Sequence, residues 1–327
     1  MLAAVEPPEA HGVRRDRVRM LAAGPRIRYD GYFSDIPRFL RPGDLIVVNN
    51  SGTMAAAVDG CRHGKAVTVH FSTQLDTGAW VVEVRPPGKA TGPLAEAAVG
   101  DRIELPDGVL VLGEPYAQGR LWQATVSVDV IELLGRHGRP IKYAYVNGDW
   151  PIEDYQTVFA QDLGSAEMPS AGRPFSAELV TELVSSGVTL APITLHTGVS
   201  SIEEGKPPLP ERFSVPSQTA RLVNLTKAVG GRVIAVGTTV TRALESAAGP
   251  EGTVTGRAGW TDLVLGPERP ARVVNGLITG WHAPGASHLR LLQAVAGTTL
   301  VREAYVAATR AGYLWHEFGD SCLLLPE

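Results

Sequence analysis

One stretch, Val58 to Val128, constrains the fold most because its pattern differs from that of the chain on either side. It contains short runs rich in β-branched and aromatic residues, separated by Gly, Pro and Asp: AVTVHF, WVVEV, DRIEL, GVLVLG and LWQATVSV. Such runs at close spacing are typical of strands joined by tight turns. We therefore predict a small antiparallel β-barrel over this stretch.

The segments around this stretch alternate between helical and strand patterns. We expect strands over 45–48, 188–196, 232–239 and 317–327, and helices over 128–138, 176–187, 222–231 and 294–312, the last as one helix or a pair. Ser176 is the expected N-cap of its helix, and Gly135 or Gly138 ends the first helix. Alternation of this kind is typical of an α/β sheet.

The barrel therefore interrupts an α/β domain. We expect the α/β domain to comprise residues 1–56 and 145–327, with the barrel domain, 57–144, inserted between them. A chain of 327 residues is long enough for two hydrophobic cores. The segment 203–217 contains four prolines and predicts an irregular loop that covers a site.

Composition argues against several classes of protein. No run approaches about 18 apolar residues, so we expect neither a membrane span nor a secretion signal. Cys61 and Cys322 lie far apart without metal-ligand spacing, which favours a reducing cytoplasm over a disulfide scaffold or a zinc site. A net charge of −4 gives no overall attraction to nucleic acid, although the arginines within 14–28 form either a local basic patch or an ordinary solvated surface.

Seven motifs occur in order along nearly the whole chain: RPGDLIVVNN (41–50), YQTVFA (155–160), PSAGRPF (169–175), ITLHTG (193–198), GGRVIAVGTTVTRALES (230–246), LITGWHAPGASHLRLLQAVAG (277–297) and FGDSCLL (318–324). Together they resemble the S-adenosylmethionine:tRNA ribosyltransferase-isomerases of queuosine synthesis. WVVEVRPPGK, 80–89, is similar to the barrel segment of that family. Seven motifs in register make a chance match improbable.

The resemblance implies an enzyme with S-adenosylmethionine as co-substrate. Such an enzyme transfers the ribosyl portion of this donor to 7-aminomethyl-7-deazaguanine in a tRNA anticodon and isomerises it to epoxyqueuosine, releasing adenine and methionine. The resemblance implies no prosthetic group and no metal, and it implies an α/β domain with an inserted six-stranded barrel. Monomer and homodimer both remain open.

The strand RVIAVG runs into a glycine turn and a helix with polar residues near its start: Gly237, Thr238, Thr239, Thr241, Arg242 and Glu245. Backbone N–H groups at a helix start suit a carboxylate. We expect the methionyl carboxylate or the ribose hydroxyls of the donor here, with Arg242 able to make a forked ion pair. The alternative is that Thr239 caps the helix and Arg242 pairs with Glu245.

His196 follows the strand ITL, at the strand end where α/β proteins gather ligand groups. The sulfonium of the donor acidifies the ribose C5′ hydrogens, so a neutral imidazole near C5′ is a candidate base that generates an ylide. The alternative is a buried histidine satisfied by backbone hydrogen bonds.

His282 lies in a second Gly/Pro turn, beside Trp281. We expect His282 to be catalytic and Thr279 to contact substrate. The face of Trp281 is suited to holding adenine or the deazaguanine base, or to stabilising the sulfonium by a cation–π interaction. Plain packing is the alternative for Trp281.

Further polar residues complete the expected site. Tyr155, Gln156 and Thr157 carry hydrogen-bonding groups suited to the edge of a purine-like base, and an ordinary strand or turn is the alternative. Asp320, in FGDS, is expected to bind a ribose hydroxyl or the acceptor amine as a catalytic residue, with capping of a turn as the alternative.

Four turns depart from the motifs of the family. Asn-Asp-Thr-Arg is here Asn49–Gly52, and Gly-Leu-His-Phe is Gly172–Phe175, with Pro174 in place of the histidine. Thr-Asn-Phe-His is Thr279–His282, and Gly-Thr-Phe is Val199–Ser201. Specificity is set mainly in loops, so we expect the chain to keep the binding of the donor. The identity of the acceptor and the course of the rearrangement stay open.

Three functions therefore compete. The first is the ribosyltransferase-isomerase acting on tRNA. The second is a divergent enzyme that uses S-adenosylmethionine on a small acceptor, such as a free 7-deazapurine, or that cleaves the donor. The third is a non-catalytic protein that binds a nucleoside or tRNA.

Overall fold

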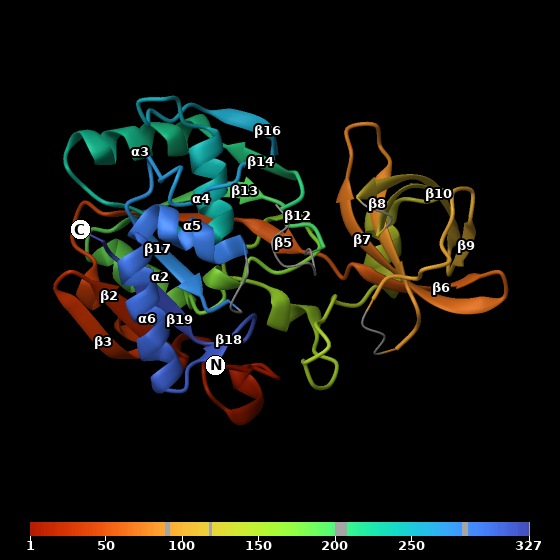
Figure 1. The fold of residues 1–327 in the computed structure, drawn as a ribbon, viewed down its shortest axis with the longest axis horizontal. Coiled ribbons are helices and arrows are strands. Elements are labelled where there is room, and N and C mark those ends of the chain that lie inside the picture. Colours follow the sequence, from red (N-terminus) through yellow and green to blue (C-terminus); the bar gives the residue numbers. More distant parts are fainter. Residues whose placement is uncertain (89–91, 118–119, 200–207, 283–286, 327) are drawn as a thin grey trace.

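The computed structural model describes residues 1–88, 92–117, 120–199, 208–282 and 287–326. Figure 1 shows two bodies side by side: a large sheet flanked by helices, and a smaller closed barrel. The predicted fold class, an α/β sheet with an antiparallel barrel from the interior of the sequence, is confirmed. The domain boundaries at 56/57 and 144/145 stay a prediction.

The barrel is formed by strands that pair antiparallel around a closed circle. In order they are β10 (Gly108–Ala117), β11 (Leu121–Val126), β8 (Trp80–Arg85), β7 (Lys65–Gln74), β6 (Ala57–Arg62) and β9 (Arg102–Leu105). Alternate residues of β7 face the interior, where Val67, Val69 and Phe71 are at most 3% exposed. This period of two is the pattern that the sequence shows.

The chain enters and leaves the barrel region at neighbouring points. Ala57 and Arg139 exchange both backbone hydrogen bonds, at 3.0 and 2.9 Å. Just before Arg139 lies α1 (Val130–His137), whose N-cap Asp129 accepts from the backbone of Glu132 at 2.9 Å. The helix ends at Gly138, where a side chain would collide with the backbone of residue 55, so Gly138 rather than Gly135 is the helix stop.

The large sheet has nine strands within the described residues, in the order β16 (Arg257–Thr261), β14 (Glu211–Val215), β13 (Thr189–Leu195), β4 (Leu45–Asn49), β15 (Val233–Val236), β17 (Gly276–Gly280), β19 (Ser321–Leu324), β2 (Arg19–Gly24) and β3 (Ile27–Tyr32). Its centre, from β13 to β17, is parallel, whereas β14 and β19 run in the opposite direction beside it. The ends of β13, β4, β15 and β17 and the starts of β14 and β19 therefore share one edge.

Helices cover both faces of this sheet (Figure 1). They are α2 (Ala177–Ser185), α3 (Ser217–Ala228), α4 (Gly237–Ser246), α5 (Ser287–Ala296) and α6 (Thr298–Arg310). Strand β4 packs on both sides: Leu45 and Val47 join the core under α4, while Ile46 and Val48 join the core that includes Leu179 of α2. All five side chains of β4 are at most 4% exposed, as a central parallel strand requires.

Two short pairs of strands lie outside the sheet and the barrel. Strand β12 (Asp162–Ser165) pairs parallel with β5 (Ser51–Thr53), and β1 (Leu2–Ala3) pairs parallel with β18 (Leu314–Trp315). The first pair continues from the end of β4 toward the barrel (Figure 1). None of the helices in the described part of the chain is long and apolar enough to cross a membrane.

Most predicted elements are confirmed, with shifted ends. The segment 294–312 is a helix pair broken at Gly297, whose φ of 76° favours glycine. The strand expected over 232–239 ends at Val236 because Gly237 begins α4, and the helix expected at 222 begins earlier, at Ser217.

The prediction of an irregular loop over 203–217 is wrong for its second half. Residues 211–215 form β14, which pairs antiparallel with both β13 and β16, and α3 begins at Ser217. The buried side chains of Phe213 and Val215, each 2% exposed, outweigh the local effect of the prolines that flank the strand. Residues 203–207 lie outside the described residues.

We predict that Ser176→Ala destabilises the fold by about 1 kcal/mol, because the Ser176 hydroxyl caps α2. It accepts from the backbone of Leu179 at 3.2 Å and donates to Asp16 at 3.1 Å. Urea denaturation followed by circular dichroism measures the change. Glu182→Ala, on the exposed face of the same helix, serves as the control, and equal stabilities of the two variants would contradict the capping role.

Candidate functional site

The shared edge of the parallel strands gathers most of the polar residues singled out from the sequence. Asn49 ends β4, His196 follows β13 and Gly237 follows β15. Glu211 begins β14 at the same edge, and Asp320 directly precedes β19. In open α/β sheets ligands bind outside the carboxyl ends of the parallel strands. The candidate site is therefore this edge, on the side that faces β5 and β12.

His196 is held from one side by hydroxyl groups. Its Nδ1 lies 2.8 Å from Oγ of Ser51, and Ser51 Oγ lies 2.6 Å from Oγ of Ser165. The Ser165 hydroxyl also accepts from the backbone N–H of Thr197 at 3.0 Å. If Nδ1–H donates to Ser51 and Ser51 donates to Ser165, both hydroxyl groups and Nδ1 have hydrogen-bond partners. The other ring nitrogen, Nε2, then keeps its lone pair.

The surroundings of His196 favour its neutral form. Burial lowers the pKa of His196 below the ordinary 6.5, and Asp162, whose carboxylate is 3.9 Å from Nε2, opposes this only partly. At Gly164, a Cβ atom would lie 2.5 Å from His196 Nδ1, so only glycine leaves room for the ring. A neutral imidazole with an available Nε2 is the form that a general base requires.

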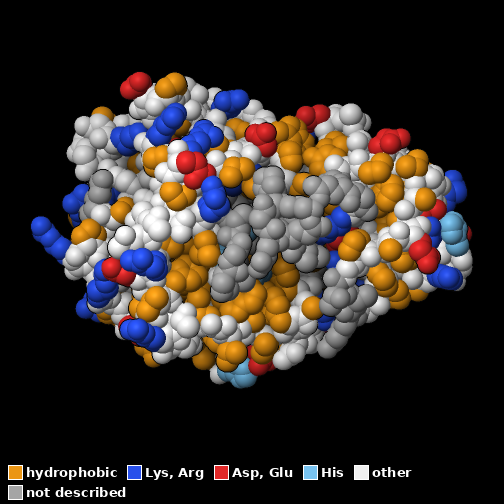
Figure 2. Space-filling view, viewed as in Figure 1, with side chains coloured by type: hydrophobic (Ala, Val, Ile, Leu, Met, Phe, Trp, Pro, Cys, Tyr) orange, Lys and Arg blue, Asp and Glu red, His pale blue; other side chains and the backbone are white. Residues whose placement is uncertain are grey.

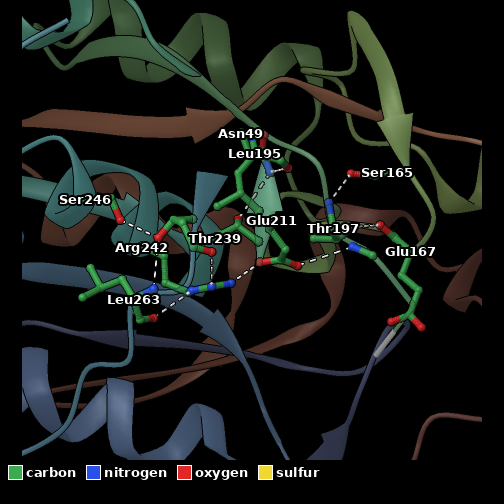
Figure 3. Close-up of polar contacts among 12 residues, drawn as sticks. Asn49, Ser165, Glu167, Leu195, Thr197, Glu211, Thr239, Arg242, Ser246 and Leu263 are labelled. Carbon is green, nitrogen blue, oxygen red and sulfur yellow. Dashed lines mark hydrogen bonds and ion pairs between the residues drawn. The ribbon is translucent and has the colours of Figure 1, made fainter. Parts of the chain in front are cut away.

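Arg242 is buried and forms an ion pair with Glu211 rather than with Glu245 (Figure 3). Its guanidinium also donates to the carbonyls of Leu263 at 3.2 Å and Thr261 at 3.0 Å. Glu211 in turn accepts from the backbone of Gly198 at 3.4 Å. Arg242 therefore joins α4 to the starts and ends of neighbouring strands, and it reaches the site through Glu211, which the sequence analysis missed.

Asn49 joins the end of β4 to β13 and α4 (Figure 3). Its amide nitrogen donates to the carbonyl of Leu195 at 2.8 Å and lies 3.4 Å from Thr239 Oγ1. Its amide oxygen accepts from the backbone of Leu195 and of Ser51. Within the described residues no side chain caps the N-terminus of α4, which begins at Gly237 with a φ of 92°. The first turn of α4 therefore presents N–H groups toward the site.

Tyr155 and Gln156 are hydrogen-bonded to Thr53 of β5, and Thr157 follows them in the chain. The side-chain amide of Gln156 pairs with both backbone groups of Thr53, at 3.0 and 2.8 Å. Tyr155 is 1% exposed and packs edge-on against Phe318 at 5.2 Å, and Thr157 accepts from the backbone of residue 159. These three residues therefore have packing and hydrogen-bonding roles in the protein, and their contact with a base stays a prediction.

Two expected ligand carboxylates also bind backbone instead. Glu245 accepts from the backbone N–H groups of residues 272, 273 and 274, at 2.8 to 3.2 Å. Asp320 accepts from Arg19 and Leu314, at 2.9 and 2.7 Å. Every carboxylate oxygen of the two residues has a backbone donor, so these side chains hold loops, and the expectation that they also meet the substrate stays a prediction.

The turn after β17 contains Thr279, Trp281 and His282. Trp281 is 1% exposed and packs edge-on against Tyr305 at 4.9 Å, and its contact with a base or with the sulfonium stays a prediction. His282 stacks on His288 at 4.4 Å, and its Nε2 lies 3.4 Å from the hydroxyl of the buried Thr279. Burial, together with His288 and His316, keeps the pKa of His282 well below 6.5.

A cluster of acidic and aromatic residues at the same edge was not anticipated from the sequence. We call it the acid–aromatic cluster, and it consists of Tyr143, Tyr145, Glu167, Trp315, His316 and Glu317. Tyr143 donates to Glu167 at 2.6 Å, and Glu317 is 6% exposed. Burial, reinforced by the charge of Glu167, raises the pKa of Glu317 well above 4.5. They come from three separate parts of the sequence, 143–145, 167 and 315–317, and no motif links them.

The backbone of the acid–aromatic cluster is strained at one point. His316 has a φ of 80°, in the left-handed region that costs a residue other than glycine about 1 kcal/mol. The tight turn closes when Gly319 N–H donates to the His316 carbonyl at 2.8 Å.

Within the described residues, no group of three or more His, Cys, Asp or Glu side chains is placed to hold a metal ion.

Comparison with known proteins finds relatives that match nearly the whole chain. The model of the family described as "Queuosine biosynthesis protein" matches residues 1–324. This chain belongs to the queuosine biosynthesis protein family. It is 36% identical to the S-adenosylmethionine:tRNA ribosyltransferase-isomerase of Symbiobacterium thermophilum, over 90% of this chain and 88% of that one. It is 34% identical to the enzyme of the same name from Synechococcus elongatus, over 99% and 92%.

A solved structure of a queuosine biosynthesis relative agrees with the fold. The crystal structure of S-adenosylmethionine tRNA ribosyltransferase from Thermotoga maritima superposes with a TM-score of 0.54 at 27% identity. The match covers 99% of this chain and 96% of that one, so both bodies in Figure 1 have counterparts. The resemblance inferred from the seven motifs is thereby confirmed.

The departures from the queuosine-family motifs have structural roles here. Ser51, in the altered turn after β4, is the residue that contacts His196. Arg173, next to Pro174, is 2% exposed and donates to the Asp154 carbonyl at 2.9 Å and to Glu9 at 2.8 Å. Residues 200 and 201 lie outside the described residues.

We predict that Glu317→Gln makes this family member more stable than the wild type at high pH. A carboxyl group whose pKa is raised by folding binds its proton more tightly in the folded state, so its contribution is lost as the pH rises above about 4.5. The difference in unfolding free energy between variant and wild type should therefore grow from pH 4.5 to pH 8. Urea denaturation at several pH values measures it.

The exposed Glu153 provides the control, because Glu153→Gln changes the same chemical group without burial. A difference between Glu317→Gln and wild type that stays constant across this pH range would contradict the assignment.

Proposed function

We propose that this chain is an S-adenosylmethionine:tRNA ribosyltransferase-isomerase that acts in the cytoplasm. It transfers the ribosyl group of S-adenosylmethionine to 7-aminomethyl-7-deazaguanine in tRNA, isomerises it to the epoxide-bearing product, and releases adenine and methionine. The observation that carries the proposal is the full-length match to relatives of that name, with His196 at the carboxyl edge of the sheet. S-Adenosylmethionine is the co-substrate in this proposal.

The start of α4 is the proposed site for the carboxylate of the donor. The first turn offers the N–H groups of Gly237, Thr238 and Thr239, and the helix dipole favours a negative charge there. Arg242 adds positive charge one turn later, although it is already paired with Glu211. We therefore assign Arg242 a supporting role, in which it fixes α4 and Glu211 rather than gripping the donor.

His196 is the proposed base. Its Nε2 removes a proton from ribose C5′, which the neighbouring sulfonium makes acidic, and Ser51 and Ser165 hold the ring in the required tautomer. His282 is the second candidate for proton transfer, since its ring is neutral at pH 7 and lies beside Thr279 at the same edge.

The proposed tRNA partner does not require a strongly basic protein. Formal net charge is −4, but Lys and Arg side chains gather over the α/β body on the face shown in Figure 2. Hydrophobic side chains gather between the two bodies on the same face. Such a face combines attraction for phosphate with surfaces on which a base can stack.

The function is tested with purified protein, S-adenosylmethionine and tRNA that carries 7-aminomethyl-7-deazaguanine. We expect release of adenine and methionine together with a gain in tRNA mass, and no release with tRNA that carries ordinary guanine. A free 7-deazapurine that replaces the tRNA would instead support the small-acceptor enzyme. Donor binding without turnover on any acceptor would support a binding protein.

We predict that His196→Ala lowers kcat about 10² to 10⁴ times, since this is the usual contribution of a positioned base. The affinity for S-adenosylmethionine should stay within about threefold, because the base acts in the transition state. Single-turnover kinetics and calorimetry separate the two quantities. His11→Ala, at an exposed histidine far from the site, is the control, and an unchanged kcat in His196→Ala would eliminate this assignment.

A further inference from the structure

Three neighbouring residues of the acid–aromatic cluster have buried polar atoms without a hydrogen-bond partner. Among the described residues these atoms are the hydroxyl of Tyr145, Nδ1 of His316 and Oε2 of Glu317. The rings of Tyr145 and His316 are 5.4 Å apart, and Glu317 follows His316 in the chain. Buried polar atoms are nearly always hydrogen-bonded, so three together indicate a group that the described residues do not supply.

Aromatic rings of the cluster pack against one another beside these atoms. Tyr143 stacks on Tyr145 with centroids 5.5 Å apart and an angle of 11° between the planes. Trp315 lies 5.5 Å from Tyr145, and His316 lies edge-on to Tyr143 at 4.3 Å. Faces of Tyr and Trp rings attract cations, and this attraction is stronger away from water.

The charges in this region also favour a cation. Glu167 and Glu317 are close enough for their charges to affect each other. Glu317 is only 6% exposed, so its charge is poorly screened by water. The guanidinium that acts on Glu317, Arg173, already binds Glu9 and the Asp154 carbonyl. The positive group that acts on Glu317 is therefore engaged elsewhere, and a buried carboxylate in this position favours a further cation.

The cluster adjoins the segments that contain both candidate histidines. The hydroxyl of Thr197, the residue after His196, donates to the carbonyl of Glu167. The backbone N–H of His316 donates to the carbonyl of Trp281, the residue before His282, at 3.1 Å. A ligand group held by the cluster therefore lies beside the proposed reaction centre.

We propose that the acid–aromatic cluster binds a primary ammonium group of a substrate through Tyr145, His316 and Glu317. A primary ammonium has three N–H donors, which match the three acceptors that lack partners. A sulfonium has the charge but no donor, so it would leave all three unsatisfied. The inference rests on the proposed function, under which two groups have this chemistry: the aminomethyl group of the acceptor base and the α-ammonium of the methionyl part of the donor.

The test compares both substrates in wild type and Glu317→Gln, which keeps the size and removes the charge. Calorimetry measures the affinity for S-adenosylmethionine and for its analogue without the α-amino group. Steady-state kinetics measure KM for tRNA with the aminomethyl base and with a hydroxymethyl analogue. We expect at least a tenfold loss for one amine-bearing substrate, with no loss for its amine-free analogue.

The substrate that weakens identifies the source of the ammonium group. Tyr145→Phe, which removes only a hydroxyl, should weaken the same substrate about threefold and covers the case in which Glu317→Gln fails to fold. Glu153→Gln is the matched control for the loss of a carboxylate on the surface. Affinities within twofold of wild type for both substrates in both cluster variants would overturn the proposal.

Failure of the proposed function is distinguishable from failure of this inference. If wild type releases no adenine, thermal shifts with methylammonium chloride, measured against sodium chloride at equal ionic strength, test the ammonium site alone. A stabilisation of wild type that is lost in Glu317→Gln supports the site even without turnover. Equal shifts in the two proteins contradict it.

Discussion

The parallel alignment of β13, β4, β15 and β17 is the constraint on which the rest of the structure depends. Because these strands are buried on both faces, their side chains fix the direction and register of each strand, and every carboxyl end arrives at one edge. Asn49, His196 and Gly237 come from distant parts of the sequence and meet only there. The chemistry of the site is thus a consequence of how a hydrophobic sheet is packed.

Many polar side chains at this edge are hydrogen-bonded to the backbone of the protein itself. Gln156 pairs with the backbone of Thr53, Glu245 collects three N–H groups, and Asp320 holds two. Buried loops need such partners because an unpaired backbone group in the interior is costly. The same carboxylate or amide suits either task, so residue type and motif alone do not separate a ligand contact from a loop support.

The sequence was sufficient for the fold because period and turn chemistry are local. The barrel and the Ser176 cap follow from patterns within a few residues. Strand β14 was missed because its five residues stand between prolines, and only pairing with β13 and β16 makes them a strand. Glu211 was missed because Arg242, with which it pairs, is 31 residues away. Tyr145 and Glu317 were missed because the cluster forms only when residues 143–145 meet residues 315–317, for which no local signal exists.

The paired backbone bonds between Ala57 and Arg139 have a consequence for how such a molecule tolerates change. Relative to the large sheet, the residues between Ala57 and Arg139 form one long loop whose two ends are hydrogen-bonded to each other. The entropy of closing a loop rises only slowly with the number of residues inside it. The barrel is therefore a part that can be enlarged, exchanged or redesigned at its far end while the strands that carry the chemistry stay in register.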